Sequence, residues 1–321
     1  MNMAEAQHLQ PLQPLQPLRG ELRLNESMAK HVSWRAGGAA ARTYAPVDLD
    51  DLSAFLRTVP VTEGLYFCGL GSNLLVRDGG LQATVVFTHW ALRQITLLNT
   101  GERTIEIHAG AGIASPKAAR FAALHGAQGA EFLAGIPGTI GGALAMNAGC
   151  YGGETWDLVC GVTTIDRAGV LHTRARSEFQ IGYRSVKRIS GPDDEWFVSA
   201  TLKVPRGDGE QASEKSRNKI KQLLSQRIAS QPLQQPNAGS VFRNPEGDHA
   251  ARLIEACGLK GTRIGGAEIS RKHANFIVNV GGPGVTKAAD IETLIDLAQN
   301  TVREKFGVAL EREVRIVGER A

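Results

Sequence analysis

Glycine is concentrated in three short stretches of this chain, and this clustering limits what the surrounding structure can be. The stretches cover residues 69–74, 110–112 and 135–142. Because glycine has no Cβ, a loop rich in it lets the backbone approach a ligand closely. Successive backbone N–H groups in such a loop can form a concave nest for an anion such as phosphate. We therefore expect a domain that holds a phosphate-bearing ligand through its loops.

The spacing of these glycines differs from the two most familiar phosphate-binding motifs. In the dinucleotide pattern G-x-G-x-x-G, the third glycine position falls on Leu74 in the first stretch and on Ser115 in the second. No P-loop lysine follows either stretch. A Rossmann or Walker site is therefore disfavoured. One glycine cluster alone is more often a tight turn, so the functional interpretation depends on three clusters occurring together.

Apolar runs, turn residues and helix caps predict a mixed α+β fold. The helix over 116–125 is expected to be capped by Ser115, opened by Pro116 and closed by Gly126. Short apolar runs between glycine-containing turns are typical of buried strands. The other predicted helices cover 49–59, 212–230, 250–257 and 287–306, and the predicted strands cover 65–68, 83–87, 162–166, 170–174, 197–204, 275–280 and 314–317.

The length of the chain sets its expected division into lobes. Single cores stop growing at roughly 250 to 300 residues, so a chain of 321 residues is expected to form more than one lobe. We predict a tail at 1–20, two lobes at 21–90 and 91–206, and a C-terminal domain at 207–321. In the tail, prolines recur at every third position, which favours an extended, disordered arm; docking of this arm to a partner is the alternative.

Charge and cysteine usage exclude several classes of protein. The net charge of +4 comes from scattered Lys and Arg without interleaved aromatic residues, so nucleic-acid binding is not expected. The four cysteines form no CxxC pair and have no histidines at metal-ligand spacing, which predicts no metal site and a reducing, cytoplasmic location. No apolar stretch reaches the roughly 18 residues of a membrane span. We expect a monomer that acts on a small anionic molecule.

Four segments together resemble a known flavoprotein family. The loops GLGSNLLV at 69–76 and GIPGTIGG at 135–142 resemble the pair that grips the FAD pyrophosphate in the vanillyl-alcohol-oxidase flavin fold. The segment AMNAGCYG at 145–152 is similar to the version found in the enolpyruvoylglucosamine reductase family. The segment HVSWRAGG at 31–38 resembles the opening segment of that family. The resemblance runs from about Leu24 to Glu319.

This resemblance implies a fold and a reaction. It implies a vanillyl-alcohol-oxidase-type FAD-binding fold in two lobes, with a C-terminal α+β domain that binds a UDP-sugar. The implied enzyme uses noncovalent FAD, with NADPH as co-substrate, to reduce UDP-N-acetylglucosamine enolpyruvate to UDP-N-acetylmuramate in peptidoglycan synthesis. Residues 184–240 are too few for the lid insertion of the longer members, so the shorter class is implied. NADPH and the enolpyruvyl sugar would use one pocket in turn, which predicts ping-pong kinetics.

The resemblance also assigns the residues that contact FAD. They are Gly69, Gly71, Ser72, Asn73, Leu74, Gly135, Ile136, Pro137, Gly138, Thr139, Gly141, Gly142 and Asn147. Cys150 occupies a position near the flavin, and covalent attachment is the alternative there; a buried thiol without such a bond is the usual state of cysteine. His273 resembles a family segment too, and we expect a structural or substrate-side role for it.

Three further residues match the catalytic groups of the family. Reduction of an enolpyruvyl ether needs a hydride at one alkene carbon, charge stabilisation beside the carboxylate, and a proton at the other carbon. Ser240 matches the proton donor, Arg184 the residue that stabilises the enolate-like charge, and Glu313 the glutamate that assists proton delivery or polarises the substrate. The weaker candidates for substrate contacts are Arg243, Asn244 and Arg315.

Other interpretations stay open at the level of the sequence. Without the resemblance, Ser240 is a turn serine after Gly239, and Arg184 and Glu313 are solvated or form ordinary ion pairs. An oxidase of the same flavin fold is the nearest alternative function, and it would react quickly with oxygen. A noncatalytic flavin-binding module is the more distant one, and it has no need for the three catalytic residues.

Overall fold

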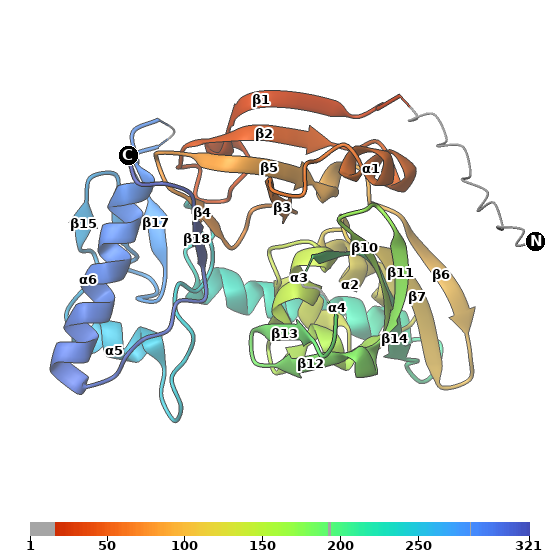
Figure 1. Cartoon of the computed structure of the whole chain (residues 1–321). Coiled ribbons are helices and arrows are strands. Elements are labelled where there is room, and N and C mark those ends of the chain that lie inside the picture. The colour runs from red at the N-terminus through yellow and green to blue at the C-terminus, as the bar shows by residue number, and fades with distance from the viewer. Residues whose placement is uncertain (1–16, 192–193, 283) are drawn as a thin grey trace, which may run out of the picture.

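The computed structural model describes residues 17–191, 194–282 and 284–321. Most of the predicted tail, residues 1–16, lies outside this described part. Three larger sheets organise the rest, one across the top of Figure 1, one at the lower right and one at the left. Every predicted strand overlaps an observed strand, so the mixed α+β prediction is confirmed. No helix in the described ranges is both long and apolar enough to cross a bilayer.

The N-terminal sheet has four strands in the order β1-β2-β5-β3. β5 runs parallel to both of its neighbours, and β1 is antiparallel to β2. The helix α1 starts after Asp48, whose side chain accepts a hydrogen bond from Asp51 N at 2.9 Å. Tyr44 stacks on Phe55 of this helix at 3.8 Å and so joins the helix to the sheet. The elements are β1 (Glu21–Ser27), β2 (Ala39–Ala45), α1 (Leu49–Leu56), β3 (Gly64–Cys68), β4 (Leu74–Val76) and β5 (Leu81–Phe87).

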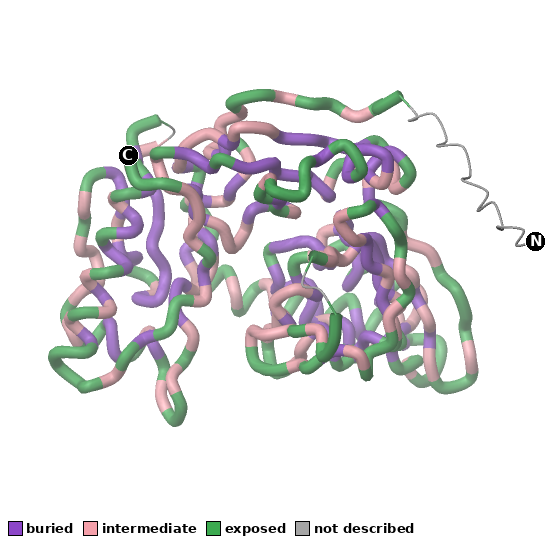
Figure 2. The backbone as a smooth tube through the Cα atoms, in the orientation of Figure 1, coloured by how far each residue is buried: buried purple, intermediate pink, exposed green. Residues whose placement is uncertain are grey.

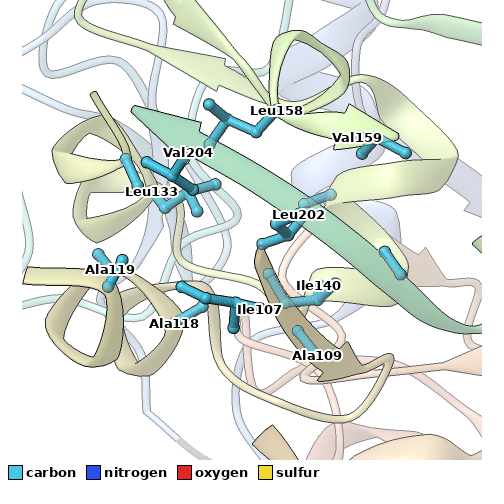
Figure 3. Close-up of a cluster of buried hydrophobic side chains, with 14 of the residues drawn as sticks. Ile107, Ala109, Ala118, Ala119, Leu133, Ile140, Leu158, Val159, Leu202 and Val204 are labelled. Atoms are coloured by element: carbon cyan, nitrogen blue, oxygen red, sulfur yellow. The ribbon is translucent and has the colours of Figure 1, made fainter. Parts of the chain in front are cut away.

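The central sheet has five antiparallel strands in the order β11-β10-β14-β7-β6. One of its faces packs against helical segments and forms the largest core of the described residues, where side chains such as Ile107 and Val204 meet Ala118 and Leu133 (Figure 3). The elements are β6 (Ile95–Thr100), β7 (Thr104–Gly110), α2 (Ser115–Leu124), α3 (Ile140–Met146), β8 (Gly149–Cys150), β9 (Gly153–Glu154), β10 (Val159–Asp166), β11 (Leu171–Ala175), β12 (Phe179–Gly182), β13 (Ser185–Arg188) and β14 (Glu195–Pro205).

The capping prediction for α2 is wrong. The helix begins at Ser115 itself, and its N-cap residue is Ala114. Ser115 Oγ is buried and has no hydrogen-bond partner among the described residues. Its backbone N–H instead donates to Gly138 O at 3.0 Å, which ties the start of the helix to a glycine loop. Gly126 follows the helix at a φ of 74°, as a terminating glycine does.

The C-terminal part shares a core with Trp34, Ala36 and Leu75 of the N-terminal part. Its own sheet has the order β15-β16-β17, and its last strand, β18, pairs in parallel with β4. Trp34 is fully buried between the two parts and donates from Nε1 to Ile277 O at 2.8 Å. The elements are α5 (Ala250–Ala256), β15 (Arg263–Ile264), β16 (Ala267–Ile269), β17 (Ile277–Asn279), α6 (Ala288–Phe306) and β18 (Arg315–Val317).

A partly buried ion pair strengthens this junction. Arg77, which follows β4, contacts both carboxylate oxygens of Glu292 in α6 at 2.9 Å. Together with Arg320, this contact lowers the pKa of Glu292 to about 2. The carboxylate is therefore ionised at neutral pH and holds α6 against the segment that follows β4.

The long helix α4 (Ala212–Ser230) matches its predicted bounds and connects the central and C-terminal parts. Ile220 of this helix belongs to the core of the central sheet, although the helix follows the predicted boundary at 207. That boundary stays a prediction. Figure 2 shows the buried backbone at the middle of each sheet and the exposed backbone along β1 and the outer loops.

Candidate active site

A cavity of about 370 Å³ is lined by residues from the N-terminal, central and C-terminal parts of the chain. The loop after β3 and the loop before α3 form part of its wall, and residues from α4 and from the C-terminal part complete it. Sites of this size accommodate ordinary small ligands. Of the cofactor-binding residues predicted from the sequence, all except Gly141 and Asn147 line this cavity.

The first glycine loop is fixed in a conformation that only glycine adopts easily. Gly71 has a φ of 58°, and a Cβ there would collide with the carbonyl oxygen of His31. Ser33 N donates to Gly71 O at 3.1 Å, so the segment at 31–38 supports this loop directly. The shape of the loop therefore depends on close contact between residues 69–76 and 31–38, two of the segments that carry the family resemblance.

The second glycine loop packs against the first. A Cβ on Gly69 would collide with the side chain of Thr139, and a Cβ on Gly138 would lie 3.0 Å from Ser72 Oγ. Among the described residues, the backbone N–H groups of Ser72, Asn73 and Gly138 have no backbone acceptor. Free backbone donors at a glycine-lined wall are suited to the oxygens of a diphosphate.

The third glycine stretch has a different purpose. The amides of Gly110, Ala111 and Gly112 donate to Gln94 O, Val198 O and Leu92 O at 2.8 to 2.9 Å, so none is free for an anion. A Cβ on Gly110 would lie 2.5 Å from Leu92 O. The expectation of a ligand loop at 110–112 is therefore wrong, and these glycines allow close packing beside β7.

Arg184 stands at the turn of the β12-β13 hairpin, at a φ of 52°. Its guanidinium donates from Nε to Glu313 Oε1 at 2.8 Å. Its Nη1 and Nη2 donate to Asn147 O at 3.3 Å and Gly149 O at 3.0 Å. The structure thus brings two of the predicted catalytic residues into contact, and both line the cavity.

Glu313 lies in a partly buried position just before β18. Its side chain is 17% exposed, and burial raises the pKa of its carboxyl above the usual range, although Arg184 acts in the opposite direction. A carboxyl with a raised pKa retains a proton more readily near neutral pH, which suits it to acid catalysis. Ser240 lines the same cavity and follows Gly239, whose φ is 76°. All three predicted catalytic residues therefore share one cavity.

Four predicted residues lie outside the cavity wall. Gly141 donates to Ala111 O at 2.9 Å and allows α3 to approach the segment after β7 closely. Arg243 donates to Glu311 at 3.2 Å and to Arg184 O at 3.3 Å. Asn244 is exposed, and its Oδ1 accepts from Ala250 N at the start of α5. Asn147 is buried and does not line the cavity. Arg315, the remaining substrate candidate, does line it.

Sequence reasoning missed Arg227 and Gln231, which line the cavity from the end of α4. Arg227 Nε donates to Gln231 Oε1 at 2.8 Å, and burial lowers the pKa of the guanidinium. A signal was present in the sequence, because Arg227 follows Ile220 and Leu223 at helical spacing on the buried face. An arginine on the apolar side of a helix is a candidate for ligand contact.

Cys150 also lines the cavity. Burial raises the pKa of its thiol, even though Arg227 and Arg184 lie nearby. The neutral thiol is the less reactive form of cysteine. This environment agrees with noncovalent binding of the cofactor.

Comparison with known proteins supplies the family. Residues 40–174 match the FAD binding domain family, and residues 231–317 match the family described as UDP-N-acetylenolpyruvoylglucosamine reductase, C-terminal domain. The UDP-N-acetylenolpyruvoylglucosamine reductase of Thiobacillus denitrificans is 54% identical over 311 residues, which cover 94% of each chain. The chain belongs to the UDP-N-acetylenolpyruvoylglucosamine reductase family. The UDP-N-acetylenolpyruvoylglucosamine reductase of Legionella pneumophila is 51% identical to this chain over 301 residues, which again cover 94% of each chain.

A solved structure of the family has the same fold. The reductase from Thermus caldophilus is 29% identical, with a TM-score of 0.73 over 93% of this chain and 98% of that one. The predicted FAD-binding fold with a C-terminal α+β domain is therefore confirmed, and the chain is an FAD-dependent oxidoreductase. The free amides of the two glycine loops fit this cofactor, since they can receive its diphosphate.

Gly71→Ala tests whether the first glycine loop holds FAD. The new Cβ would be placed at a positive φ and against His31 O, so the loop must move. The left-handed conformation alone costs about 1–2 kcal/mol, and we expect FAD to bind roughly tenfold more weakly. Flavin content after purification and a titration of apoprotein with FAD measure this. Gly161→Ala, where a Cβ meets nothing closer than 3.6 Å, is the control and should bind FAD normally.

Proposed function

We propose that this protein reduces UDP-N-acetylglucosamine enolpyruvate to UDP-N-acetylmuramate with electrons from NADPH, a step in peptidoglycan synthesis. The observation that carries the proposal is the meeting of Arg184, Glu313 and Ser240 in the cavity that the two FAD loops enclose. When bound, FAD would supply a hydride for the terminal alkene carbon and would accept one from NADPH. The chain itself must bind the carboxylate, stabilise charge and deliver a proton.

Arg184 receives the carboxylate of the enolpyruvyl group. Hydride addition to the terminal carbon moves negative charge onto the neighbouring carbon and into that carboxylate. A guanidinium already fixed by Asn147 O, Gly149 O and Glu313 does not need to reorient as this charge develops. Preorganised donors of this kind stabilise the transition state more than the ground state.

Ser240 protonates the carbon that bears the carboxylate. Its O–H bond breaks as the new C–H bond forms, and the alkoxide left on the side chain recovers its proton from water or a neighbouring acid. A serine hydroxyl is a very weak acid, so this step requires a basic carbanion and a site from which water is excluded. Ser240 is only partly exposed, within a cavity lined by three parts of the chain.

Glu313 assists this transfer as a neutral acid. Arg184 is its ion-pair partner in the absence of substrate. When the substrate carboxylate binds to Arg184, a second negative charge comes close to Glu313, and the already raised pKa of the carboxyl rises further. The protonated carboxyl can then donate to the substrate or restore the Ser240 proton.

The alternatives from the sequence lack a comparable argument. An oxidase of the same fold does not require a proton donor such as Ser240, or a carboxyl such as Glu313 to assist it. A noncatalytic flavin module does not require a carboxyl with a raised pKa in its cavity. The predicted catalytic residues and the glycine loops line one and the same cavity, so NADPH and the sugar nucleotide would use it in turn. We therefore expect ping-pong kinetics; binding of both ligands at once would contradict this.

Isotope labelling of the product tests the proposal. Turnover of the enolpyruvyl substrate with NADPH in D₂O should yield UDP-N-acetylmuramate with one deuterium beside the carboxylate, from the solvent-exchanged Ser240 hydroxyl. Turnover in H₂O with NADPH deuterated at the transferred position should place the label in the methyl group instead. Mass spectrometry and NMR of the product distinguish these outcomes. Absence of any reduced product, with oxygen consumed instead, would support the oxidase.

A pH profile tests the role of Glu313. The rate at which the enolpyruvyl substrate oxidises the reduced enzyme should fall as pH rises through the raised pKa, because the neutral carboxyl is the active form. Glu313→Gln should lose this alkaline limb. Its amide keeps a hydrogen-bond donor but has no proton to give, so we expect a rate about 10²-fold lower at the low-pH plateau, the lower end of the usual contribution of a general acid. An unchanged limb in Glu313→Gln would assign the titration to another group.

A further inference from the structure

We infer that Asn147 is a positioning residue for Arg184, and that its side chain does not contact FAD. The inference rests on the proposed function, because it concerns the group that receives the substrate carboxylate. Asn147 ends α3 in the left-handed conformation, with a φ of 40°, and is 1% exposed. It lies outside the cavity wall, unlike the residues before and after it at 146 and 148.

The hydrogen-bonding groups of the Asn147 side chain are already used within the protein. Nδ2 donates to Glu154 Oε2 at 2.7 Å and to Gly182 O at 3.2 Å. Oδ1 accepts from Trp156 N at 3.1 Å. A primary amide has only two N–H donors, and both are committed here. A flavin in the cavity therefore finds no free donor on this side chain.

These contacts hold the turn that carries Arg184. Arg184 has a φ of 52°. Residues other than glycine rarely adopt this backbone conformation, and it requires support from neighbouring residues. The carbonyl of Gly182, two residues earlier in the same hairpin, accepts from Asn147 Nδ2. The Asn147 amide thus joins the end of α3 to the hairpin turn.

The backbone of the same segment fixes the guanidinium. Asn147 O and Gly149 O accept from Nη1 and Nη2 of Arg184, and Glu313 accepts from Nε. A guanidinium is planar and its donors have fixed directions, so three acceptors define its orientation. Gly149 must be glycine for this approach, because a Cβ there would lie 2.7 Å from Gly153 O and 3.3 Å from Arg184 Nη1. Two of the three acceptors therefore depend on the segment that the Asn147 side chain anchors.

Asn147→Ala separates positioning of Arg184 from binding of FAD. We expect normal FAD content and a normal rate of flavin reduction by NADPH. Oxidation of the reduced enzyme by the enolpyruvyl substrate should slow by roughly 10²-fold, the effect of misplacing a catalytic group by about 1 Å. Calorimetry with the oxidised holoenzyme should show weaker binding of the substrate, a readout that does not depend on turnover.

Asn147→Asp adds a signature that simple destabilisation cannot produce. The new carboxylate would face Glu154, with Asp157 and Arg184 nearby, and at high pH it has no proton to donate. Two adjacent carboxylates share a proton as pH falls, which restores the donor between positions 147 and 154. The oxidation rate of Asn147→Asp should therefore recover on acidification, relative to the wild-type profile, and that of Asn147→Ala should not.

Thr155→Val is the matched control. Thr155 is buried in the same segment, and its hydroxyl donates to Ala148 O at 2.7 Å without contact to Arg184. This variant should lower Tm yet keep both flavin reactions at wild-type rates. Loss of FAD or an equal slowing of both reactions in Asn147→Ala would overturn the inference, as would wild-type oxidation by the substrate. Failure of the wild-type enzyme itself to be oxidised by the substrate would instead overturn the proposed function.

Discussion

Ser240→Ala is expected to stop the protein at its reduced state. The variant should bind FAD and accept electrons from NADPH at the wild-type rate, because Ser240 belongs to the C-terminal wall of the cavity and not to the glycine loops. Oxidation by UDP-N-acetylglucosamine enolpyruvate should slow by roughly 10² to 10⁴-fold, the usual contribution of a positioned acid. Stopped-flow absorbance of the flavin under anaerobic conditions measures both reactions in one sample.

Ser240→Cys serves as the companion variant. A thiol is a stronger acid than a hydroxyl and occupies nearly the same volume, so it should restore part of the lost rate if the side chain delivers a proton. A partly restored oxidation rate in Ser240→Cys, together with a low rate in Ser240→Ala, would show that the side chain at 240 transfers a proton and does not act through packing alone. Equal oxidation rates in wild type and Ser240→Ala would remove Ser240 from the mechanism and leave it as a turn residue after Gly239.

Arg184→Gln is expected to cause the second large loss. Removing the guanidinium leaves the substrate carboxylate and Glu313 without their cation, and one preorganised electrostatic group commonly contributes about 10² to 10³-fold. The loss should appear in kcat/KM for the enolpyruvyl substrate, whereas flavin reduction by NADPH should stay normal. Anaerobic steady-state and single-turnover kinetics provide the two values.

Arg184→Lys is the control for charge and backbone strain. Lysine keeps the positive charge and the side-chain stem at the same φ, but it cannot satisfy three acceptors in one plane. We expect partial recovery of kcat/KM relative to Arg184→Gln, with similar Tm values for the two variants. Equal activity of wild type and Arg184→Gln would show that the ion pair with Glu313 is structural only.

Local patterns were enough to predict much of the fold. The helix that ends at Gly307 was found close to its predicted bounds, as α6. α4 also matches its predicted bounds, although it has no capping side chain at its start and Gln231 at its end. The prediction of Ser115 as a cap was wrong because a serine at a helix start can stand at the first helical position as well as at the cap. The glycines at 110–112 were misjudged for a similar reason. Close packing and ligand binding both require glycine, and only the partners of the amides tell the two apart.

Contacts between distant segments could not be predicted in the same way. The pairing of β18 with β4 and the contact of Arg184 with Glu313 join residues that no local pattern connects. The family resemblance placed the predicted catalytic residues in order along the chain, but it did not say that two of them form an ion pair. Asn147 shows the limit most clearly, since its motif predicted a flavin contact while its amide is committed to Glu154 and Gly182.

One anaerobic experiment tests the central claim most directly. The purified holoenzyme is reduced with a single equivalent of NADPH, and UDP-N-acetylglucosamine enolpyruvate is then added while flavin absorbance is followed. The account predicts that the yellow, oxidised flavin returns rapidly and that UDP-N-acetylmuramate forms in equal amount. A flavin that stays reduced until oxygen is admitted would contradict the proposed reaction and leave only the FAD-binding fold.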